Sequence, residues 1–260
     1  MTEKTGDRVQ KIIARAGICS RRKAEVLIEE GRVTVNGKRV TELGTRADIS
    51  RDVVKVDGEI IHPMKKQVYI LLYKPLGVVT TKSDEKNRTT VMDLLGSEER
   101  KSLFPVGRLD LNSEGLLLIT NDGEFANHMM SPASHVSKTY LIRVRGVPDN
   151  RKIARLENGM MLDGVKTRKA KVRMVGHGLN SWLEVELVEG KRNQLRRMFK
   201  RVGHPVVKLK RVRIGNLNAE GLGPGKYRRL SAGEVEALLA PPAKNERAGR
   251  KRKPGGKEKT

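Results

Sequence analysis

The chain is poor in aromatic residues, which make up 3% of its 260 residues: three Phe, four Tyr and one Trp. Modules that bind single-stranded RNA usually stack bases on several aromatic rings. With so few rings, base stacking can occur at a few places only. Any affinity for a nucleic acid must therefore come mainly from phosphate contacts and from shape.

The chain also has a single cysteine, Cys19, and no long run of apolar residues. One cysteine excludes an internal disulfide framework and fits a reducing compartment. A membrane span needs about 20 apolar residues, and the first ten residues, MTEKTGDRVQ, lack the apolar core of a signal peptide. We therefore expect a cytoplasmic protein with no membrane segment. The five histidines are scattered, without metal-ligand spacing, so we expect no metal.

Acidic residues are also few. The chain has 30 Asp and Glu against 54 Lys and Arg, which gives a formal net charge of +24. The excess positive charges repel one another in a compact fold, so a polyanionic partner is the natural explanation for them. Nucleic acid is the first candidate. An anionic membrane surface fits less well, because no basic helix carries a strong face of Trp, Phe and Leu residues, which membrane-surface helices use.

Residues 7–40 predict two short helices followed by a hairpin. Asp7 can cap the N-terminus of a helix over 9–16, and Gly17 can end that helix. Ser20 can cap a second helix from 21 to about 29. Asn36-Gly37 then stands between short strands at 33–35 and 38–40, which is a strong signal for a hairpin turn.

Three cations, Arg21, Arg22 and Lys23, crowd the first turn of the second predicted helix. The helix dipole disfavours cations there by a few tenths of a kcal/mol each, roughly. One interpretation is an ordinary solvated basic face. The other, which we favour, is a phosphate clamp in which free backbone N–H groups and the three cations point at the same anion.

The remainder of the chain mixes strand and helix patterns. Strands are predicted at 69–73, 116–119, 139–145, 170–175 and 182–188, and helices at 91–95, 124–130, 151–158 and 193–202. Several neighbouring strands look like hairpins, so we expect an α+β domain on a mostly antiparallel mixed sheet. The predicted organisation is an N-terminal domain at 1–62, a linker at 63–68, a second domain at 69–240 and a disordered basic tail at 241–260.

The helix predicted at 193–202 is strongly amphipathic. Its apolar stripe consists of Leu195, Met198, Phe199 and Val202, and its other faces are almost wholly basic. Ten Lys or Arg and no acidic residue occur from 191 to 213. Soluble helix faces normally mix the two signs. We therefore expect this stretch to lie on phosphates, with contacts from Arg192, Arg197 and Lys200.

One carboxylate stands out in the stretch GRLDLNSEGLLLITNDG, where Asp110 precedes a strand bound for the core. A charge beside a core strand costs free energy unless it is paired. Asp110 could simply close a turn through an Asx hydrogen bond. However, Asn112 and Ser113 can supply that turn chemistry, and a carboxylate near phosphate-binding surfaces repels the partner. These points favour a functional role for Asp110.

Several stretches resemble known families. ARAGICSRRKAEVLIEEGRVTVNG, at 14–37, resembles the small RNA-binding domain named after ribosomal protein S4. Four later stretches resemble the RsuA/RluB family of ribosomal RNA pseudouridine synthases, closest to its large-subunit branch: LLYKPLGVVTT at 71–81, GRLDLNSEGLLLITNDGE at 107–124, SKTYLIRVRG at 137–146 and EGKRNQLRRMFKRVGHPVVKLKRVRIGNL at 189–217. LGPGKYRRLSAGEVEAL, at 222–238, also fits, so the resemblance spans about 7–238.

The resemblance implies an S4-type domain followed by a pseudouridine synthase catalytic domain. It implies that a uridine in large-subunit (23S) ribosomal RNA is flipped out, cleaved at its glycosidic bond, and rejoined to the ribose through carbon five without any cofactor. The expected partner is ribosomal RNA or a pre-ribosomal particle, and the expected state is a monomer. The alternatives are the same chemistry on small-subunit RNA, or an RNA-binding protein of ribosome assembly without catalysis.

The resemblance also implies roles for residues. Asp110 would be the catalytic carboxylate, and Arg196 its basic partner, able to hold it in bidentate geometry. Tyr140 would pack on the target base, although it could equally be a core residue of its strand. Arg196 could instead be an ordinary phosphate contact. Arg108 would contact RNA or support the loop, and Gln194 aligns with a substrate-binding position.

The basic tail generates a first prediction. Removal of residues 241–260 takes away eight basic and two acidic residues, and each lost phosphate contact reduces the number of counterions released on binding. We expect the truncated protein to bind RNA more weakly and with a shallower dependence of affinity on salt, as measured by a titration series. The chemical step should be unchanged. An unchanged salt slope would show that the tail does not touch phosphate.

Overall fold

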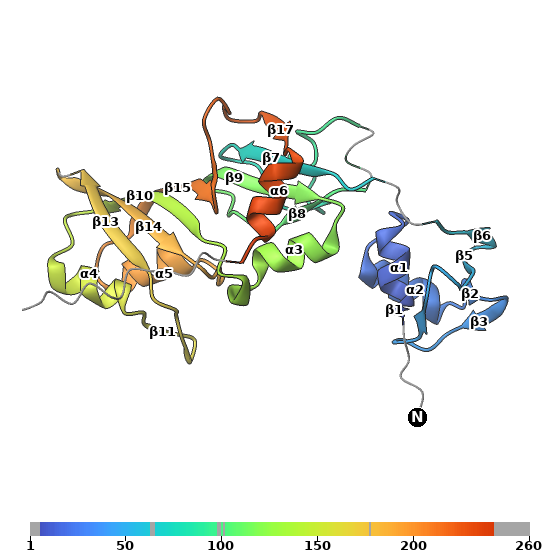
Figure 1. The fold of residues 1–260 in the computed structure, drawn as a ribbon. Coiled ribbons are helices and arrows are strands. Elements are labelled where there is room, and N and C mark those ends of the chain that lie inside the picture. The colour runs from blue at the N-terminus through green and yellow to red at the C-terminus, as the bar shows by residue number, and fades with distance from the viewer. Residues whose placement is uncertain (1–5, 63–65, 98–99, 101, 177, 242–260) are drawn as a thin grey trace, which may run out of the picture.

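The computed structural model describes residues 6–62, 66–97, 100, 102–176 and 178–241. The N-terminal domain, residues 6–62, forms a separate lobe, and the C-terminal domain, within 66–241, is built on one large sheet (Figure 1). The predicted tail, apart from its first residue, and half of the predicted linker lie outside the described residues. No helix among the described residues is long and apolar enough to cross a membrane.

The N-terminal domain packs two helices on a small sheet. Its elements are β1 (Asp7–Arg8), α1 (Val9–Arg15), α2 (Arg21–Glu29), β2 (Val33–Val35), β3 (Lys38–Val40), β4 (Arg46–Ala47), β5 (Val54–Val56) and β6 (Glu59–Ile60). Ser20 caps α2 by accepting a hydrogen bond from the Lys23 backbone N–H, as predicted. The predicted hairpin is also confirmed, with Asn36 and Gly37 both at positive φ between β2 and β3.

The predicted cap at Asp7 is wrong. Asp7 belongs to β1, which pairs with β4, and the residue at the N-cap of α1 is Arg8, which makes no side-chain cap. The Asp7 carboxylate instead forms ion pairs with Lys11, at 2.6 Å, and with Arg15. The hydrogen bond from Lys11 lowers the pKa of the Asp7 carboxyl. The Asp7 carboxylate thus pairs with two cations of α1 and does not cap the backbone N–H groups of that helix.

The C-terminal domain contains the remaining elements. These are β7 (Tyr69–Lys74), β8 (Phe104–Val106), β9 (Glu114–Thr120), α3 (Gly123–Met130), the 3-10 helix η2 (Pro132–Ser134), β10 (Lys138–Arg145), α4 (Asn150–Glu157), β11 (Met161–Leu162), β12 (Val165–Lys166), β13 (Lys171–Gly176), β14 (Asn180–Leu187), α5 (Gln194–Arg201), β15 (Val206–Ile214), β16 (Leu217–Asn218), β17 (Tyr227–Arg229) and α6 (Ala232–Leu239). The predicted strands and three of the four predicted helices are confirmed.

The helix predicted at 91–95 is wrong, because the chain forms turns there. Asp93 accepts hydrogen bonds from the backbone N–H of Thr90, at 2.9 Å, and from its hydroxyl, at 2.8 Å. A helix of five residues gains too few internal hydrogen bonds to overcome its nucleation cost. The local Asp93–Thr90 bonds therefore decide the conformation.

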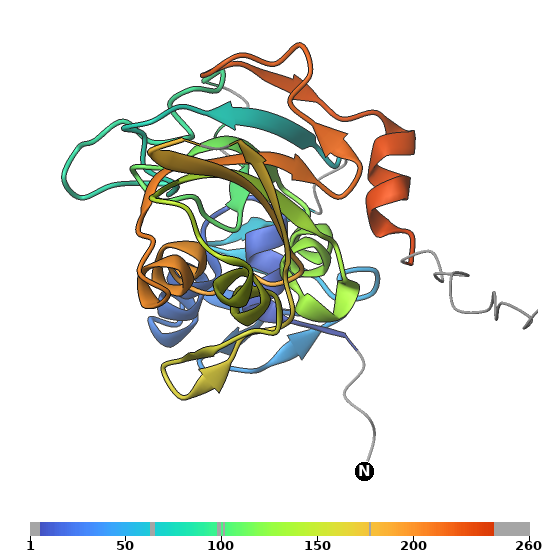
Figure 2. The ribbon, with the colours of Figure 1, turned by 90° about the vertical axis from the view of Figure 1, so that its left-hand side faces the viewer.

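The described strands of the C-terminal domain form a nine-stranded sheet with the central order β13-β14-β10-β15-β9-β7-β17. Its named strands pair antiparallel except for β9 and β15, which pair in parallel, so the predicted mixed and mostly antiparallel sheet is confirmed. Helices α3, α4 and α5 lie along one side of the curved sheet (Figure 2). One core cluster joins β10, β13 and β14 to α4 and α5, and another joins β7 and β9 to α3 and α6.

The parallel contact between β9 and β15 requires a glycine. Gly115 has a φ of +109°, and a Cβ atom there would lie 2.7 Å from the Arg211 backbone nitrogen and still closer to its carbonyl oxygen. The register pairs Gly115 with Arg211 and Glu114 with Lys210. This close approach brings together the two halves of the sheet, each with its own core cluster.

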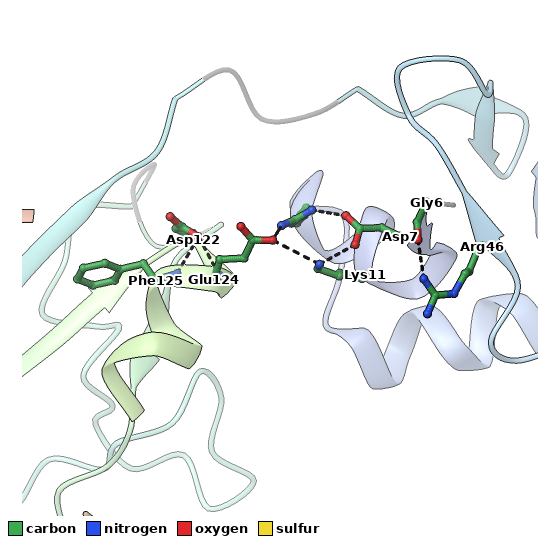
Figure 3. Close-up of polar contacts among 8 residues, drawn as sticks. Gly6, Asp7, Lys11, Arg46, Asp122, Glu124 and Phe125 are labelled. Atoms are coloured by element: carbon green, nitrogen blue, oxygen red, sulfur yellow. Dashed lines mark hydrogen bonds and ion pairs between the residues drawn. The ribbon is translucent and has the colours of Figure 1, made fainter. Parts of the chain in front are cut away.

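Surface ion pairs connect the two domains. Glu124, in the first turn of α3, forms ion pairs with Lys11, at 3.5 Å, and with Arg15 (Figure 3). The same two cations pair with Asp7. The Glu124 side chain is 68% exposed, so these pairs are screened by solvent and contribute little free energy. The core cluster of the N-terminal domain contains residues of that domain alone. Each domain therefore has its own apolar core.

Gly115 generates a prediction for stability. Gly115→Ala should lower the free energy of unfolding by about 3 kcal/mol or more, because the substitution adds both backbone strain and a clash with β15. Gly233→Ala is the matched control, since a Cβ at Gly233 in α6 meets nothing within 4 Å, and a helical Gly→Ala change stabilises by about 0.5–1 kcal/mol. Thermal unfolding compares the two. Equal melting temperatures for Gly115→Ala and the wild type would contradict this account of the junction.

Candidate active site

A cavity of about 390 Å³ lies beside the β9–β15 junction. Its walls come from the loop before β9, the end of α3, strands β10 and β15, and the segment that leads into α5. This volume falls within the range of small-molecule sites. Six residues with predicted roles line the cavity: Arg108, Asp110, Tyr140, Arg192, Gln194 and Arg196.

The loop that carries Asp110 is fixed by the segment after β7. The Thr80 hydroxyl donates to the Leu109 carbonyl at 2.7 Å, and the Gly77 N–H donates to the Leu111 carbonyl at 3.0 Å. The turn itself is closed by main-chain atoms, because the Ser113 N–H donates to the Asp110 carbonyl at 3.0 Å. The Asp110 side chain, 48% exposed, is therefore not needed to form the turn.

Lys74, at the end of β7, anchors the same loop from the buried interior of the domain. Its fully buried ammonium donates to the carbonyls of Ser113, at 2.8 Å, and Pro75, at 2.9 Å. Burial lowers the pKa of Lys74 to about 8, while the carboxylates of Asp110 and Glu114 act in the opposite direction. Sequence analysis assigned Lys74 no role. The sequence feature that could have identified Lys74 is its charge at the end of an otherwise apolar strand, because a buried charge requires partners.

Asn193 makes the direct contact with the Asp110 carboxylate. We assign the amide orientation in which the nitrogen donates to Oδ2 at 2.7 Å and to Oδ1 at 3.0 Å, because the opposite orientation places oxygen against oxygen. Asn193 precedes α5 in the left-handed conformation, with a φ of +51°, which Asn adopts more readily than most residues. The backbone thus turns this side chain toward Asp110. Sequence analysis did not identify this contact.

Arg196 does not form the expected bidentate pair with Asp110. Its Nε lies 3.9 Å from Oδ2, beyond hydrogen-bond distance. Its Nη2 instead donates to the Asn112 carbonyl at 2.7 Å and to the Ser113 hydroxyl at 3.2 Å. From the first turn of α5, Arg196 therefore clamps the loop and places a positive charge near the carboxylate.

Tyr140 combines the two interpretations that the sequence left open. It lies on β10, is partly buried, and packs against the core cluster of β10, β13, β14, α4 and α5. It also lines the cavity. Its partner on β15 is Arg211, which also lines the cavity. The same side chain can support the core and present its ring to a ligand.

Gln194 is buried, and both ends of its amide have partners within the protein. Its oxygen accepts from the Lys191 N–H at 3.0 Å, and its nitrogen donates to Glu189 at 2.7 Å. Glu189 also accepts from the Arg168 N–H at 2.9 Å. Gln194 therefore holds the segment 189–194 in shape, in addition to lining the cavity.

The other predicted cations are spread over the surface. Arg108 and Arg192 are exposed at the cavity, Arg197 pairs with Asp163, and Lys200 is exposed on α5. The structure does not bring Arg21, Arg22 and Lys23 into the cavity, because they lie exposed on the first turn of α2. Arg21 lines a second cavity of about 400 Å³ with Lys11 and Arg46. No group of three or more metal-ligating side chains occurs in the described ranges.

Comparisons with known proteins match both domains. The profile of the RNA pseudouridylate synthase family matches residues 68–201, and the profile of the S4 domain matches residues 7–54. Ribosomal large subunit pseudouridine synthase B of Bacillus subtilis is 44% identical over 237 residues, covering 90% of this chain and 96% of the relative. The enzyme of the same name from Haemophilus influenzae is 41% identical over 240 residues, covering 90% and 67%.

A solved structure agrees with these sequence matches. The crystal structure of a pseudouridylate synthase superposes with a TM-score of 0.66 at 29% identity, covering 89% of this chain and 99% of that one. The Asp110 loop, Tyr140 and Arg196 all lie within the range that the family profile matches. The family expected from the sequence motifs is confirmed: the chain belongs to the RNA pseudouridine synthases, with an S4 domain at its N-terminus.

Proposed function

We propose that this protein converts a specific uridine of large-subunit ribosomal RNA to pseudouridine, with Asp110 as the catalytic carboxylate. The observation that carries the proposal is the state of Asp110: its side chain is not needed for its turn and lines the cavity beside Asn193 and Arg196. The relatives named ribosomal large subunit pseudouridine synthase B support the choice of substrate.

The proposed reaction is an isomerisation. The bond between N1 of the uracil and C1′ of the ribose breaks, a bond between C5 and C1′ forms, and a proton leaves C5 while N1 gains one. A carboxylate can act as a nucleophile at the sugar carbon or at the pyrimidine, and it can move a proton. Either role needs a carboxylate held in one direction. Asn193 and Arg196 would supply that orientation, and Tyr140 would pack on the base.

The target base must leave its RNA stack to reach Asp110, which costs a few kcal/mol, roughly. Phosphate contacts would offset this cost. Arg108 and Arg192 are exposed at the cavity, Lys200 is exposed on α5, and Arg197 lies partly exposed on α5 beside Asp163. These four cations would contact the RNA near the target base. The cations Arg21, Arg22 and Lys23 on α2 would bind phosphates farther away.

The remaining partners follow from the same chemistry. The isomerisation is neither a redox reaction nor a group transfer from a donor, so the proposed enzyme acts without a cofactor. Its partner is ribosomal RNA or a pre-ribosomal particle in the cytoplasm, and we propose that it works as a monomer. Small-subunit RNA as the substrate is an outcome that the following experiment detects.

Asp110→Asn should abolish the modification, because the amide lacks the charge and the nucleophilicity of the carboxylate. A deletion strain is complemented with either version, and pseudouridines in both ribosomal RNAs are mapped by carbodiimide-stopped reverse transcription. One stop should be absent from the deletion strain, return with the wild type and stay absent with Asp110→Asn. Asp149→Asn, a cap of α4 outside the cavity, is the control and should restore the stop.

Two results would contradict this proposal. Restoration of every stop by Asp110→Asn would remove Asp110 from the chemistry. If deletion changes no stop, the protein modifies neither ribosomal RNA, and a non-catalytic role in ribosome assembly becomes the better explanation.

Asn193→Gly should lower kcat by about 10–100-fold, since a hydrogen bond to a charged group is worth about 1.5–3 kcal/mol. Glycine keeps the left-handed backbone but removes the amide that faces Asp110. The affinity for RNA should remain unchanged. Asn87→Gly is the control, because Asn87 is also left-handed and exposed but lies outside the cavity. Single-turnover rates and RNA titrations compare the variants, and equal rates for Asn193→Gly and the control would refute the role of the amide.

A further inference from the structure

The floor of the cavity carries two cations that the proposed chemistry does not yet use. Lys138 begins β10 and Arg211 lies on β15, and both side chains line the cavity. Arg211 is 6% exposed, and Lys138 is half-buried. Cations buried at this depth cost free energy unless their donors and charge are used.

Arg211 has a donor without a partner. Its Nε donates to the Leu116 carbonyl on β9 at 2.6 Å. Its Nη2 is buried and has no hydrogen-bond partner among the described residues. A buried donor that remains unsatisfied costs about 1–3 kcal/mol. Because Arg211 lines the cavity, an acceptor on a bound ligand is the natural partner for this group.

Lys138 adds a second positive charge beside Arg211. Its ammonium donates to the carbonyls of Met129 and Val136, both at 2.8 Å. Burial, and next the positive charge of Arg211, lower the pKa of Lys138 to about 8. The hydrogen bonds of both cations in the described structure thus go to neutral carbonyls, and the floor of the cavity is electropositive.

This arrangement selects the chemistry of its ligand. Fixed donors with excess positive charge favour a group that presents acceptors, such as the carbonyl oxygens at C2 and C4 of uracil. Cytosine shares the C2 carbonyl but carries an amino group at C4, so donors placed at C4 would select uracil and donors placed at C2 would accept either base. The register places Tyr140 beside Arg211, so a base that packs on the Tyr140 ring would lie next to the guanidinium.

We propose that Arg211, supported by Lys138, recognises a carbonyl oxygen of the flipped-out uracil and stabilises the negative charge that this oxygen gains as the glycosidic bond breaks. The inference rests on the proposed function. When the N1–C1′ bond breaks, its electron pair stays with the base and spreads over N1 and the carbonyl oxygens. This charge disappears once C5 has bonded to C1′, the C5 proton has left and N1 has taken up a proton.

Arg211→Met tests this role with an unbranched side chain that retains the apolar stem and has no donor. Loss of one donor to a developing negative charge lowers kcat by about 10²–10³-fold, and we expect that loss in single-turnover rates on an RNA fragment containing the mapped uridine. The affinity for that fragment should be unchanged. Arg173→Met is the control, since Arg173 lies on β13, is 71% exposed and lies outside the cavity. Its kcat should equal that of the wild type.

A second measurement separates recognition from structural support. The target uridine is replaced by 2-thiouridine or 4-thiouridine, because sulfur is a weaker acceptor than oxygen. One replacement should slow the wild type, and that slowing should disappear in Arg211→Met, as in a double-mutant cycle. Should Arg211→Met fail to fold in thermal unfolding, Arg211→Lys takes its place, because it keeps the charge but changes the donor geometry, and its thio effect should shrink.

The outcomes distinguish the two proposals. If the wild type converts the uridine but the thio effect is the same in the Arg211 variant, Arg211 only supports the sheet and this inference is overturned. An unchanged kcat in the variant overturns it as well. Failure of the complementation experiment itself removes the proposed function.

Discussion

The close parallel contact between β9 and β15 is the constraint on which the site depends. Gly115 permits it, because any side chain there would collide with the backbone of Arg211. The loop that carries Asp110 immediately precedes β9, and α5, which carries Arg196, immediately precedes β15. The parallel register sets Glu114, the first residue of β9, opposite Lys210, so the loop before β9 lies beside the first residues of β15. Arg196 accordingly donates to carbonyls of both segments, those of Asn112 and Val206. The carboxylate, its amide partner Asn193 and its neighbouring cation therefore meet because two strands far apart in sequence run side by side in the same direction.

Local rules predicted the features that local interactions determine. The Ser20 cap, the Asn36-Gly37 turn and the apolar stripe of α5 each depend on residues within about one or two turns of one another. The Asp7 cap failed because a longer-range strand pairing and two cations competed for the same residue. The motif containing Asp110 was predicted from its unusual charge and from family resemblance. The contacts of Lys74 with Ser113 and of Arg211 with Leu116 join residues 39 and 95 positions apart, and no local pattern encodes such partners.

The site solves an electrostatic problem that the net charge of +24 creates. A bidentate guanidinium would bind Asp110 tightly but would also occupy both of its oxygens with a permanent charge. The neutral amide of Asn193, 2.7 Å and 3.0 Å from the two carboxylate oxygens, fixes the direction of the carboxylate. The Arg196 Nε lies 3.9 Å from Oδ2, and the Arg196 Nη2 donates to the loop. The carboxylate is thereby oriented without being neutralised. The same reasoning explains Lys74, which donates its hydrogen bonds to the carbonyls of Pro75 and Ser113.

The two domains are held by different kinds of force, and the difference suits their proposed tasks. Buried donors and a glycine contact hold the walls of the cavity together, as a site that orients a reacting group requires. The N-terminal domain has a separate core and forms surface ion pairs with the C-terminal domain through Lys11, Arg15 and the exposed Glu124 (Figure 3). The Arg21 side chain also approaches Gly123 of α3. Surface ion pairs of this kind contribute about 0–1 kcal/mol each. Phosphates of a bound RNA attract the same two cations, so the nucleic acid can replace Glu124 as their partner at little cost.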